Sequence, residues 1–124
     1  MAQSIAVIGA STNREKYSNR AVRAYRAEGY TVYPVNPNAD EIEGLKAYAS
    51  VLDVPEQIDL ATLYLPPKWG LRAADDIIAK GIPEVLVTPG AESPELIEKL
   101  KNAGVNAIQG CSIIALGRNP AEFD

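Results

Sequence analysis

Apolar residues follow two patterns along this chain, and each pattern predicts one kind of element. Five short runs are mostly apolar or β-branched and lack regular polar alternation, which is typical of strands covered on both faces. Between these runs, apolar residues recur every three or four positions, which predicts helices with one buried face. The predicted strands are Ile5–Ile8, Thr31–Val35, Leu60–Tyr64, Val85–Val87 and Asn106–Ile108.

The predicted helices have recognisable ends. Ser93 is a favoured N-cap residue and Pro94 suits the first helical position, while Gly104 can adopt the left-handed conformation that ends a helix. The helix before it ends ahead of Gly81, and the first helix of the chain ends near Gly29. Their inward stripes are Ala21, Val22 and Tyr25, then Leu71, Ala74, Ile77 and Ile78, and finally Leu96, Ile97, Leu100 and Ala103.

This alternation of strands and helices predicts an α/β protein. We expect a Rossmann-like three-layer αβα sandwich with a parallel sheet of about five strands. No linker or change of composition interrupts the chain, so residues 1–124 are expected to form one domain. Ligands of such sheets lie beyond the carboxyl ends of the strands, so the residues that follow each strand are the candidate site.

Composition excludes several classes of function. A formal net charge of −4 argues against a nucleic-acid partner, because such proteins carry a basic surface. No apolar run is long enough to span a membrane, and a single cysteine suits a reducing compartment, so we expect a cytoplasmic protein with no membrane partner. The chain contains no histidine, which excludes His/Cys metal sites and His-dependent nucleophiles; we expect neither a metal site nor catalytic residues.

The loop after the first strand carries groups that suit a phosphate. Gly9 permits a sharp turn out of the strand, and the next residues offer hydroxyl and amide donors near the start of a helix. The alternative is that these polar residues only cap the first helix. The candidate phosphate-binding residues are Gly9, Ser11, Thr12 and Asn13, with Arg14, Lys16 and Arg20 as nearby cations.

The loop after the second strand argues against an ordinary NAD site. Such a site places a carboxylate there for the ribose hydroxyls, whereas this chain has no acid before Asp40. Val35, Asn36 and Pro37 suit packing against a flat adenine, or form a simple strand-ending turn. The third and fourth loops, stiffened by proline, add Leu65, Pro66, Pro67, Thr88, Pro89 and Gly90 as candidates.

Two residue types that occur once are interpreted structurally. Trp69 follows the third loop and is interpreted as a core or interface anchor, with a role as a stacking platform left open. Cys111 follows the last strand and is interpreted as a small buried apolar residue. The apolar segment SIIALG could pack on the core or on a second copy of the chain, so a homodimer also stays open.

Several motifs in a fixed order give the chain a resemblance to a known family. They are AVIGAS, SNRAVRAYRAEGY, VYPVNP, IDLATLYLPP and VLVTPGAES, with a cysteine after the last strand. In these motifs the chain resembles the small stand-alone CoA-binding proteins, which are similar to the CoA-binding domain of the succinyl-CoA synthetase alpha subunit. The resemblance implies that the loop from Gly9 to Asn13 holds the diphosphate of coenzyme A and that Val35, Asn36 and Pro37 line its adenosine. It further implies that Leu65, Pro66 and Pro67 border the adenine and the start of the pantetheine arm, and that Thr88, Pro89 and Gly90 approach that arm further along.

The chain departs from this family in one charged position. Relatives often carry a lysine or arginine directly after the VNP turn, where it can meet the 3′-phosphate of CoA, whereas this chain has Asn38 and Ala39. Either Arg14, Lys16 or Arg20 reaches that phosphate, or the affinity for CoA is weakened. The ligase reaction of succinyl-CoA synthetase uses a phosphorylated histidine, which this chain lacks.

We therefore expect non-catalytic binding of coenzyme A or an acyl-CoA, a small-molecule ligand, at the carboxyl edge of the sheet. One alternative is an NAD(P)-binding enzyme or redox sensor on the same fold. The other is a regulatory or interaction domain that has kept the fold and lost its ligand.

Overall fold

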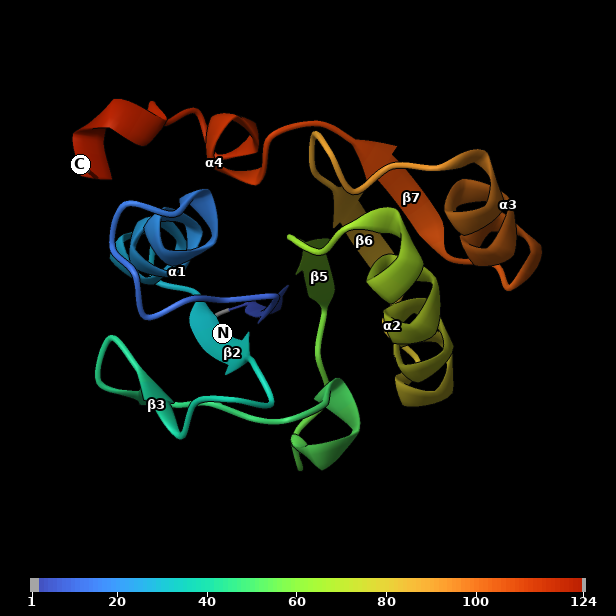
Figure 1. Cartoon of the computed structure of the whole chain (residues 1–124), viewed down its shortest axis with the longest axis horizontal. Coiled ribbons are helices and arrows are strands. Elements are labelled where there is room, and N and C mark those ends of the chain that lie inside the picture. The colour runs from blue at the N-terminus through green and yellow to red at the C-terminus, as the bar shows by residue number, and fades with distance from the viewer. Residues whose placement is uncertain (1–2, 124) are drawn as a thin grey trace.

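The computed structural model describes residues 3–123 and contains a five-stranded parallel sheet (Figure 1). The strands lie in the order β2-β1-β5-β6-β7. Their bounds are β1 (Ser4–Ile8), β2 (Thr31–Val35), β5 (Leu60–Leu63), β6 (Glu84–Val87) and β7 (Asn106–Gln109). All five predicted strands are therefore present, with ends that differ from the predicted ones by a residue at most.

Helices cover both faces of this sheet, which confirms the predicted three-layer sandwich (Figure 1). On one face, α1 (Tyr17–Ala27) and the short α4 (Ser112–Ala115) pack on apolar side chains of β1 and β2. On the other face, α2 (Pro67–Lys80) and α3 (Pro94–Asn102) pack on β5 and β6. The two apolar clusters form because β1, β5 and β6 are buried at almost every position, as strands between two helical layers must be.

Two features near β2 were not predicted. A hairpin of β3 (Glu41–Ile42) and β4 (Leu45–Lys46) follows β2, and a 3-10 turn, η1 (Val51–Asp53), leads toward β5. A second 3-10 turn, η2 (Pro120–Phe123), lies near α1 at the other end of the chain. Strands of two residues are too short to give a periodic signal, although Ile42 of the hairpin is buried beside α1.

The first helix begins later than the loop chemistry suggested. Its N-cap residue is Lys16, so a seven-residue polar segment separates Gly9 from the first helical residue, Tyr17. The alternative in which Ser11 to Asn13 cap this helix directly is therefore wrong. In contrast, the predicted cap of α3 is confirmed, because the Ser93 hydroxyl accepts a hydrogen bond from the Leu96 amide at 3.2 Å.

The strand order reverses between β1 and β5. From β1 the chain moves outward to β2, then crosses back to the opposite side of β1 to form β5. The register pairs Ile8 with Val35 on one side and with Leu63 on the other, so these strands end level with one another. This reversal is where a parallel sheet leaves a crevice for a ligand.

No helix within residues 3–123 has the length and apolar character needed to cross a membrane.

Candidate functional site

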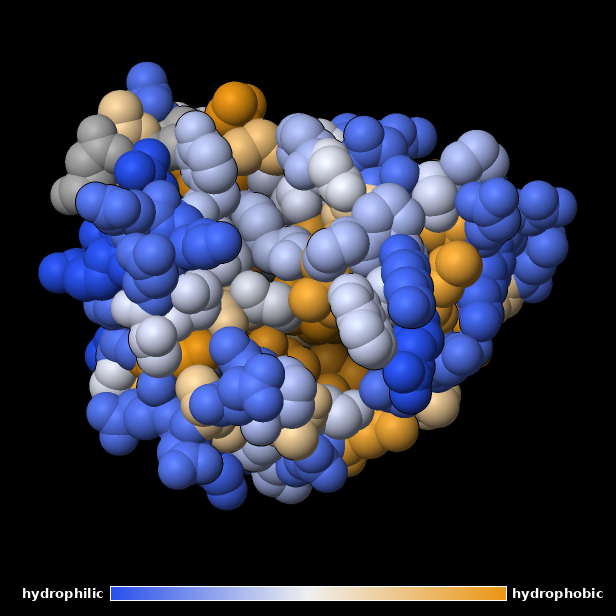
Figure 2. Space-filling model, in the orientation of Figure 1, coloured by the Kyte–Doolittle hydropathy of each residue, from blue (hydrophilic) through white to orange (hydrophobic). Residues whose placement is uncertain are grey.

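A hollow of about 800 Å³ opens where the strand order reverses. It lies between the end of β2, the η1 turn and the beginning of α2, and Figure 2 shows its apolar floor surrounded by polar side chains. Its lining residues are Ile8, Gly9, Val35, Asn36, Pro37, Asn38, Ala49, Ser50, Val51, Leu65, Trp69, Arg72, Ala73, Asp75 and Asp76. Five candidates from the sequence are among them: Gly9, Val35, Asn36, Pro37 and Leu65.

Gly9 is required at the floor of the hollow for two reasons. Its φ of 89° is one that residues with a Cβ atom rarely adopt. In addition, a Cβ atom at this position would lie 2.5 Å from the carbonyl oxygen of Tyr64, the residue that follows β5. The absence of a side chain therefore lets the first loop leave β1 in close contact with the end of β5.

Asn36 fixes the wall of the hollow at the end of β2. Its side-chain amide donates to the Ala10 carbonyl at 2.9 Å, and its Oδ1 accepts from the Asn38 amide at 2.7 Å. The Val35 carbonyl meanwhile accepts from the amides of Gly9 and Ala10 at 3.0 and 3.3 Å. These bonds join the first two loops, so the wall is held in place by its own backbone and the asparagine.

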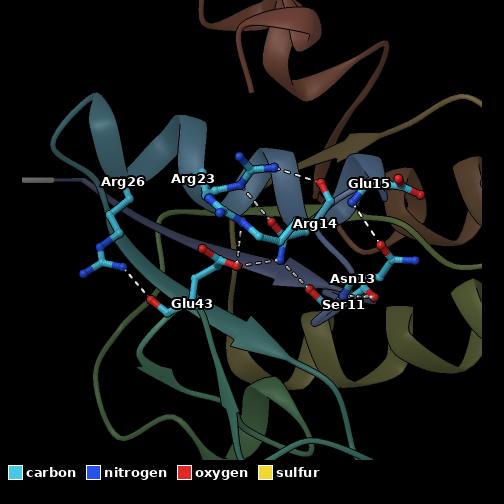
Figure 3. A network of polar contacts seen from close by, with 8 residues as sticks. Ser11, Asn13, Arg14, Glu15, Arg23, Arg26 and Glu43 are labelled. Carbon is cyan, nitrogen blue, oxygen red and sulfur yellow. Dashed lines mark hydrogen bonds and ion pairs between the residues drawn. The ribbon is translucent and has the colours of Figure 1, made fainter. Parts of the chain in front are cut away.

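The first loop is also organised by internal hydrogen bonds (Figure 3). Ser11 Oγ accepts from the Asn13 amide at 3.0 Å, and Asn13 Oδ1 accepts from the Glu15 amide at 3.0 Å. Asn19 of α1 donates to the Ser11 carbonyl at 2.8 Å. Within residues 3–123, the amide N–H groups of Ser11, Thr12 and Arg14 have no hydrogen-bond acceptor, so the loop retains backbone donors for an anion.

The cations of the first loop lie outside the hollow. Glu43, in the turn of the β3–β4 hairpin, accepts from the side chain of Asn19 at 3.1 Å and is ion-paired with Arg14 at 3.5 Å (Figure 3). Lys16 is exposed at the start of α1, and the guanidinium of Arg20 lies over the Tyr17 ring at 5.2 Å. None of the three predicted cations is among the lining residues of the hollow.

The third and fourth loops lie beside the hollow. Pro66 is the N-cap residue of α2 and Pro67 its first helical residue, as suits a proline without an amide hydrogen. The Thr88 hydroxyl is buried and donates to the Leu63 carbonyl, so it holds β6 against β5. Pro89 and Gly90 are exposed beyond β6, and these are the groups of the fourth loop that a ligand could reach.

Of the interpretations of Trp69, a place in the core is wrong, while an interface anchor and a stacking platform both remain open. Its side chain is 47% exposed, and it lines the hollow from the first turn of α2. The guanidinium of Arg72 lies 5.4 Å from the centre of its ring, and Lys68 Nζ lies 5.5 Å from it. Arg72 was missed in the sequence, although helical spacing places it on the same face as Trp69, three residues earlier.

A buried polar cluster lies behind the strand ends. Tyr64 and Ser112 share a hydrogen bond of 2.5 Å between their hydroxyls, and Tyr25 donates to the Ser112 carbonyl at 2.7 Å. Burial raises the pKa of Tyr64 to about 12, and burial also raises the pKa of Tyr25, so both hydroxyls stay neutral near pH 7. Cys111 is half-buried at this cluster, less enclosed than predicted.

Comparison with known proteins identifies the family to which this site belongs. Residues 3–117 match the family model described as a CoA binding domain. The chain belongs to this family. Because the match covers nearly all of the described residues, it includes each strand-end loop that borders the hollow.

The chain is similar to proteins of two kinds. The acetate–CoA ligase [ADP-forming] II of Archaeoglobus fulgidus is 37% identical over 95 residues, which are 75% of this chain and 14% of that protein. A conserved hypothetical protein of Pyrococcus furiosus has a solved structure with a TM-score of 0.85 and 39% identity, covering 93% of this chain and 99% of that one. A dinucleotide-forming acetyl-coenzyme A synthetase of Ca. Korarchaeum cryptofilum, in complex with phosphate and ADP, matches with a TM-score of 0.76 and 33% identity over 85% of this chain.

The chain spans a small part of its ligase relatives. It covers 14% of the Archaeoglobus ligase and 25% of the Korarchaeum synthetase structure. It covers 81% of the uncharacterised protein YneT of Bacillus subtilis, with 28% identity over 109 residues. Most of each large relative therefore has no counterpart in the matched residues.

Proposed function

We propose that this protein binds coenzyme A or an acyl-CoA without catalysing its conversion. The adenosine occupies the hollow between Asn36 and the beginning of α2. The diphosphate lies over the first loop, at the amides of Ser11 and Thr12. The pantetheine arm then runs over the ends of β5 and β6, past Pro66 and Gly90.

The observation that carries this proposal is a difference between helix N-termini. The helices α1 and α2 begin beside the first loop and the hollow; neither has a side-chain cap hydrogen bond or an acid in its first turn, and the short α4 shares this property. The third helix, α3, has both a serine cap and Glu95 in its first turn. Uncapped N-termini keep free amide donors and a partial positive charge, which suit a phosphate.

The first loop adds donors of the same kind. The free amides of Ser11, Thr12 and Arg14 lie between Gly9 and α1, where a phosphate can accept from several of them together. The end of β2 presents Asn36 and Pro37 rather than a carboxylate, so nothing there selects an unphosphorylated ribose. The amides suit the diphosphate of either cofactor, and the missing carboxylate favours a phosphorylated adenosine over NAD.

The proposed absence of catalysis rests on the titratable groups. The chain has no histidine, and burial raises the pKa of Tyr64 to about 12, further above neutrality than its ordinary value. The hollow itself is lined by two carboxylates, Asp75 and Asp76, with no nucleophile beside them except the Ser50 hydroxyl, which donates to Asp76 at 3.0 Å.

Calorimetric titration with CoA, acetyl-CoA and NAD tests the proposal. We expect CoA and acetyl-CoA to bind with similar affinity, since the thiol end lies beyond the hollow, and NAD to bind more weakly. Incubation with acetyl-CoA should leave the thioester intact. Tighter binding of NAD, or no binding of either CoA compound, contradicts the proposal and favours a redox enzyme or a domain without a ligand.

A further inference from the structure

Arg72 is the one lining residue of the hollow, among those that the structure describes, that carries a positive charge. It lies in the second turn of α2, and its side chain is exposed. Its guanidinium makes no hydrogen bond or ion pair with any of residues 3–123; its one contact of this kind is with the ring of Trp69. This cation is therefore present in the hollow without a neutralising carboxylate.

The two acids of the hollow are each held by another group. Asp75 forms an ion pair with Lys99 of α3 at 2.5 Å, and Asp76 accepts from the Ser50 hydroxyl at 3.0 Å. Both lie one turn further along α2 than Arg72, at spacings that would allow a pair with it. Because neither acid forms an ion pair with Arg72, its guanidinium remains available to an anion.

Contact with the tryptophan ring leaves the hydrogen-bonding groups of Arg72 free. A guanidinium over an aromatic ring uses its face for that contact, while its N–H groups point outward in its own plane. Lys68 lies near the same ring at 5.5 Å and increases the local positive potential. Trp69 thus lies beside a guanidinium at the hollow, and the donor fork of a guanidinium matches the oxygens of a phosphate.

The opposite wall offers no such group. The turn that follows β2, Asn36-Pro37-Asn38, carries no cation, and Arg14 of the first loop is ion-paired with Glu43 outside the hollow. A phosphate attached to a ribose in this hollow therefore meets one cationic side chain of the lining, and that side chain comes from α2.

We propose that Arg72, positioned by Trp69, binds the 3′-phosphate of the adenylate and makes the site selective for CoA over dephospho-CoA. The proposal rests on the proposed function, since it places the adenosine of that ligand in the hollow. It assigns selectivity to α2 rather than to the end of β2 or to the first loop.

The experiment compares CoA with dephospho-CoA by calorimetry and by the fluorescence of Trp69, the single tryptophan of the chain. We expect the wild-type protein to bind CoA about tenfold more tightly than dephospho-CoA, as for one charged hydrogen-bonded contact. CoA should also change the fluorescence emission of Trp69, because binding of the phosphate to Arg72 changes the contact between the guanidinium and the ring. The preference should decrease with added salt.

Variants separate Arg72 from the other cations. Arg72→Gln should remove the preference for CoA while keeping the affinity for dephospho-CoA, and Arg72→Lys should restore part of the preference. Lys101→Gln removes one exposed positive charge from α3, away from the hollow, and should leave the preference unchanged. Circular dichroism of each variant establishes that it is folded.

The outcomes distinguish this inference from the proposed function. If the wild-type protein binds both ligands equally, or if Arg72→Gln keeps the preference, the inference is overturned while binding of CoA stands. If Arg14→Gln abolishes the preference and Arg72→Gln does not, the first loop is the phosphate-selective element instead. Absence of CoA binding in the calorimeter overturns both.

Discussion

Gly9, where the first loop passes close to the end of β5, separates two groups of polar residues, one beside α1 and one beside α2. The two groups differ in whether their cations are paired with carboxylates. On the side of α1, the loop from Ser11 to Lys16 bonds to itself and to Asn19, and Arg14, one of its two cations, is paired with Glu43. On the side of α2, Arg72 and Lys68 have no carboxylate partner within residues 3–123. Backbone donors thus dominate one side and side-chain charge the other.

A cation near a phosphate loop is therefore not necessarily available to the phosphate. Arg14 is close to the free amides in sequence, yet a hairpin 29 residues away supplies the carboxylate that pairs with it. Arg72 lies outside any phosphate motif, yet the beginning of α2 brings it to the hollow. Availability depends on which acids the tertiary structure brings nearby.

The largest predicted effect concerns Gly9, whose close approach to the Tyr64 carbonyl joins the α1 side to the α2 side. Gly9→Ala should lower the free energy of unfolding by about 3–4 kcal/mol, because it adds a clash with the Tyr64 carbonyl to the strain of a positive φ. Gly29→Ala is the matched control, with a φ of 88° and no neighbour within 4 Å of the added methyl group. It should cost about 1–2 kcal/mol.

Urea unfolding measures both variants. Equal losses would mean that the close approach of β1 and β5 does not depend on glycine, and that the α1 side and the α2 side are less tightly coupled than the contact distance indicates.

The sequence predicted the sheet well because β1, β5 and β6 are buried on both faces, and such strands are continuous apolar runs whatever their order. It also located the edge that carries the hollow, since Gly9, Asn36 and Leu65 all follow strands. It did not predict the partner of Arg14, because Glu43 belongs to a hairpin too short for a periodic signal. Nor did it show that Trp69 is exposed, since an aromatic residue beside an apolar stripe more often packs inward.

Because the N-terminus of α1 has no side-chain cap, we predict that adding one raises the free energy of unfolding and lowers the affinity for CoA. Lys16 has the extended backbone of an N-cap residue, with φ −71° and ψ 141°, so Lys16→Ser should cap the helix and raise the free energy of unfolding by about 0.5–1 kcal/mol. The same serine would accept from an amide in the first turn of α1 and so weaken the partial positive charge that this N-terminus offers to the diphosphate. CoA should therefore bind more weakly to Lys16→Ser than to Lys16→Gln, which removes the charge without adding a cap.

Removing the N-cap of α3 should lower the stability without changing the affinity for CoA. Ser93→Ala should cost about 1 kcal/mol and leave the affinity for CoA unchanged, because α3 begins away from the hollow. Chemical unfolding of the three variants measures the change in stability, and calorimetry measures the change in affinity for CoA. If Lys16→Ser and Lys16→Gln bind CoA equally, the first turn of α1 does not contact the diphosphate.

The smallest predicted effect concerns Glu43, whose carboxylate pairs with Arg14 on the α1 side. Glu43→Gln removes the negative charge that pairs with Arg14 and keeps the shape of the side chain. We expect the affinity for CoA to rise about threefold, since Arg14 is 66% exposed and such ion pairs contribute only ~0.2–1 kcal/mol. The free energy of unfolding should fall by a similar small amount, because the contact of Glu43 with Asn19 also weakens.

Glu15→Gln controls for charge alone. Glu15 lies in the same loop and is exposed, and its carboxylate makes no hydrogen bond or ion pair with any of residues 3–123. If both variants raise the affinity equally in calorimetry at low salt, general repulsion explains the gain and the pairing of Arg14 has no separate role. If Glu43→Gln raises it more, the hairpin limits how much of the first loop's charge reaches the ligand, and its effect should disappear in the double variant with Arg14→Gln.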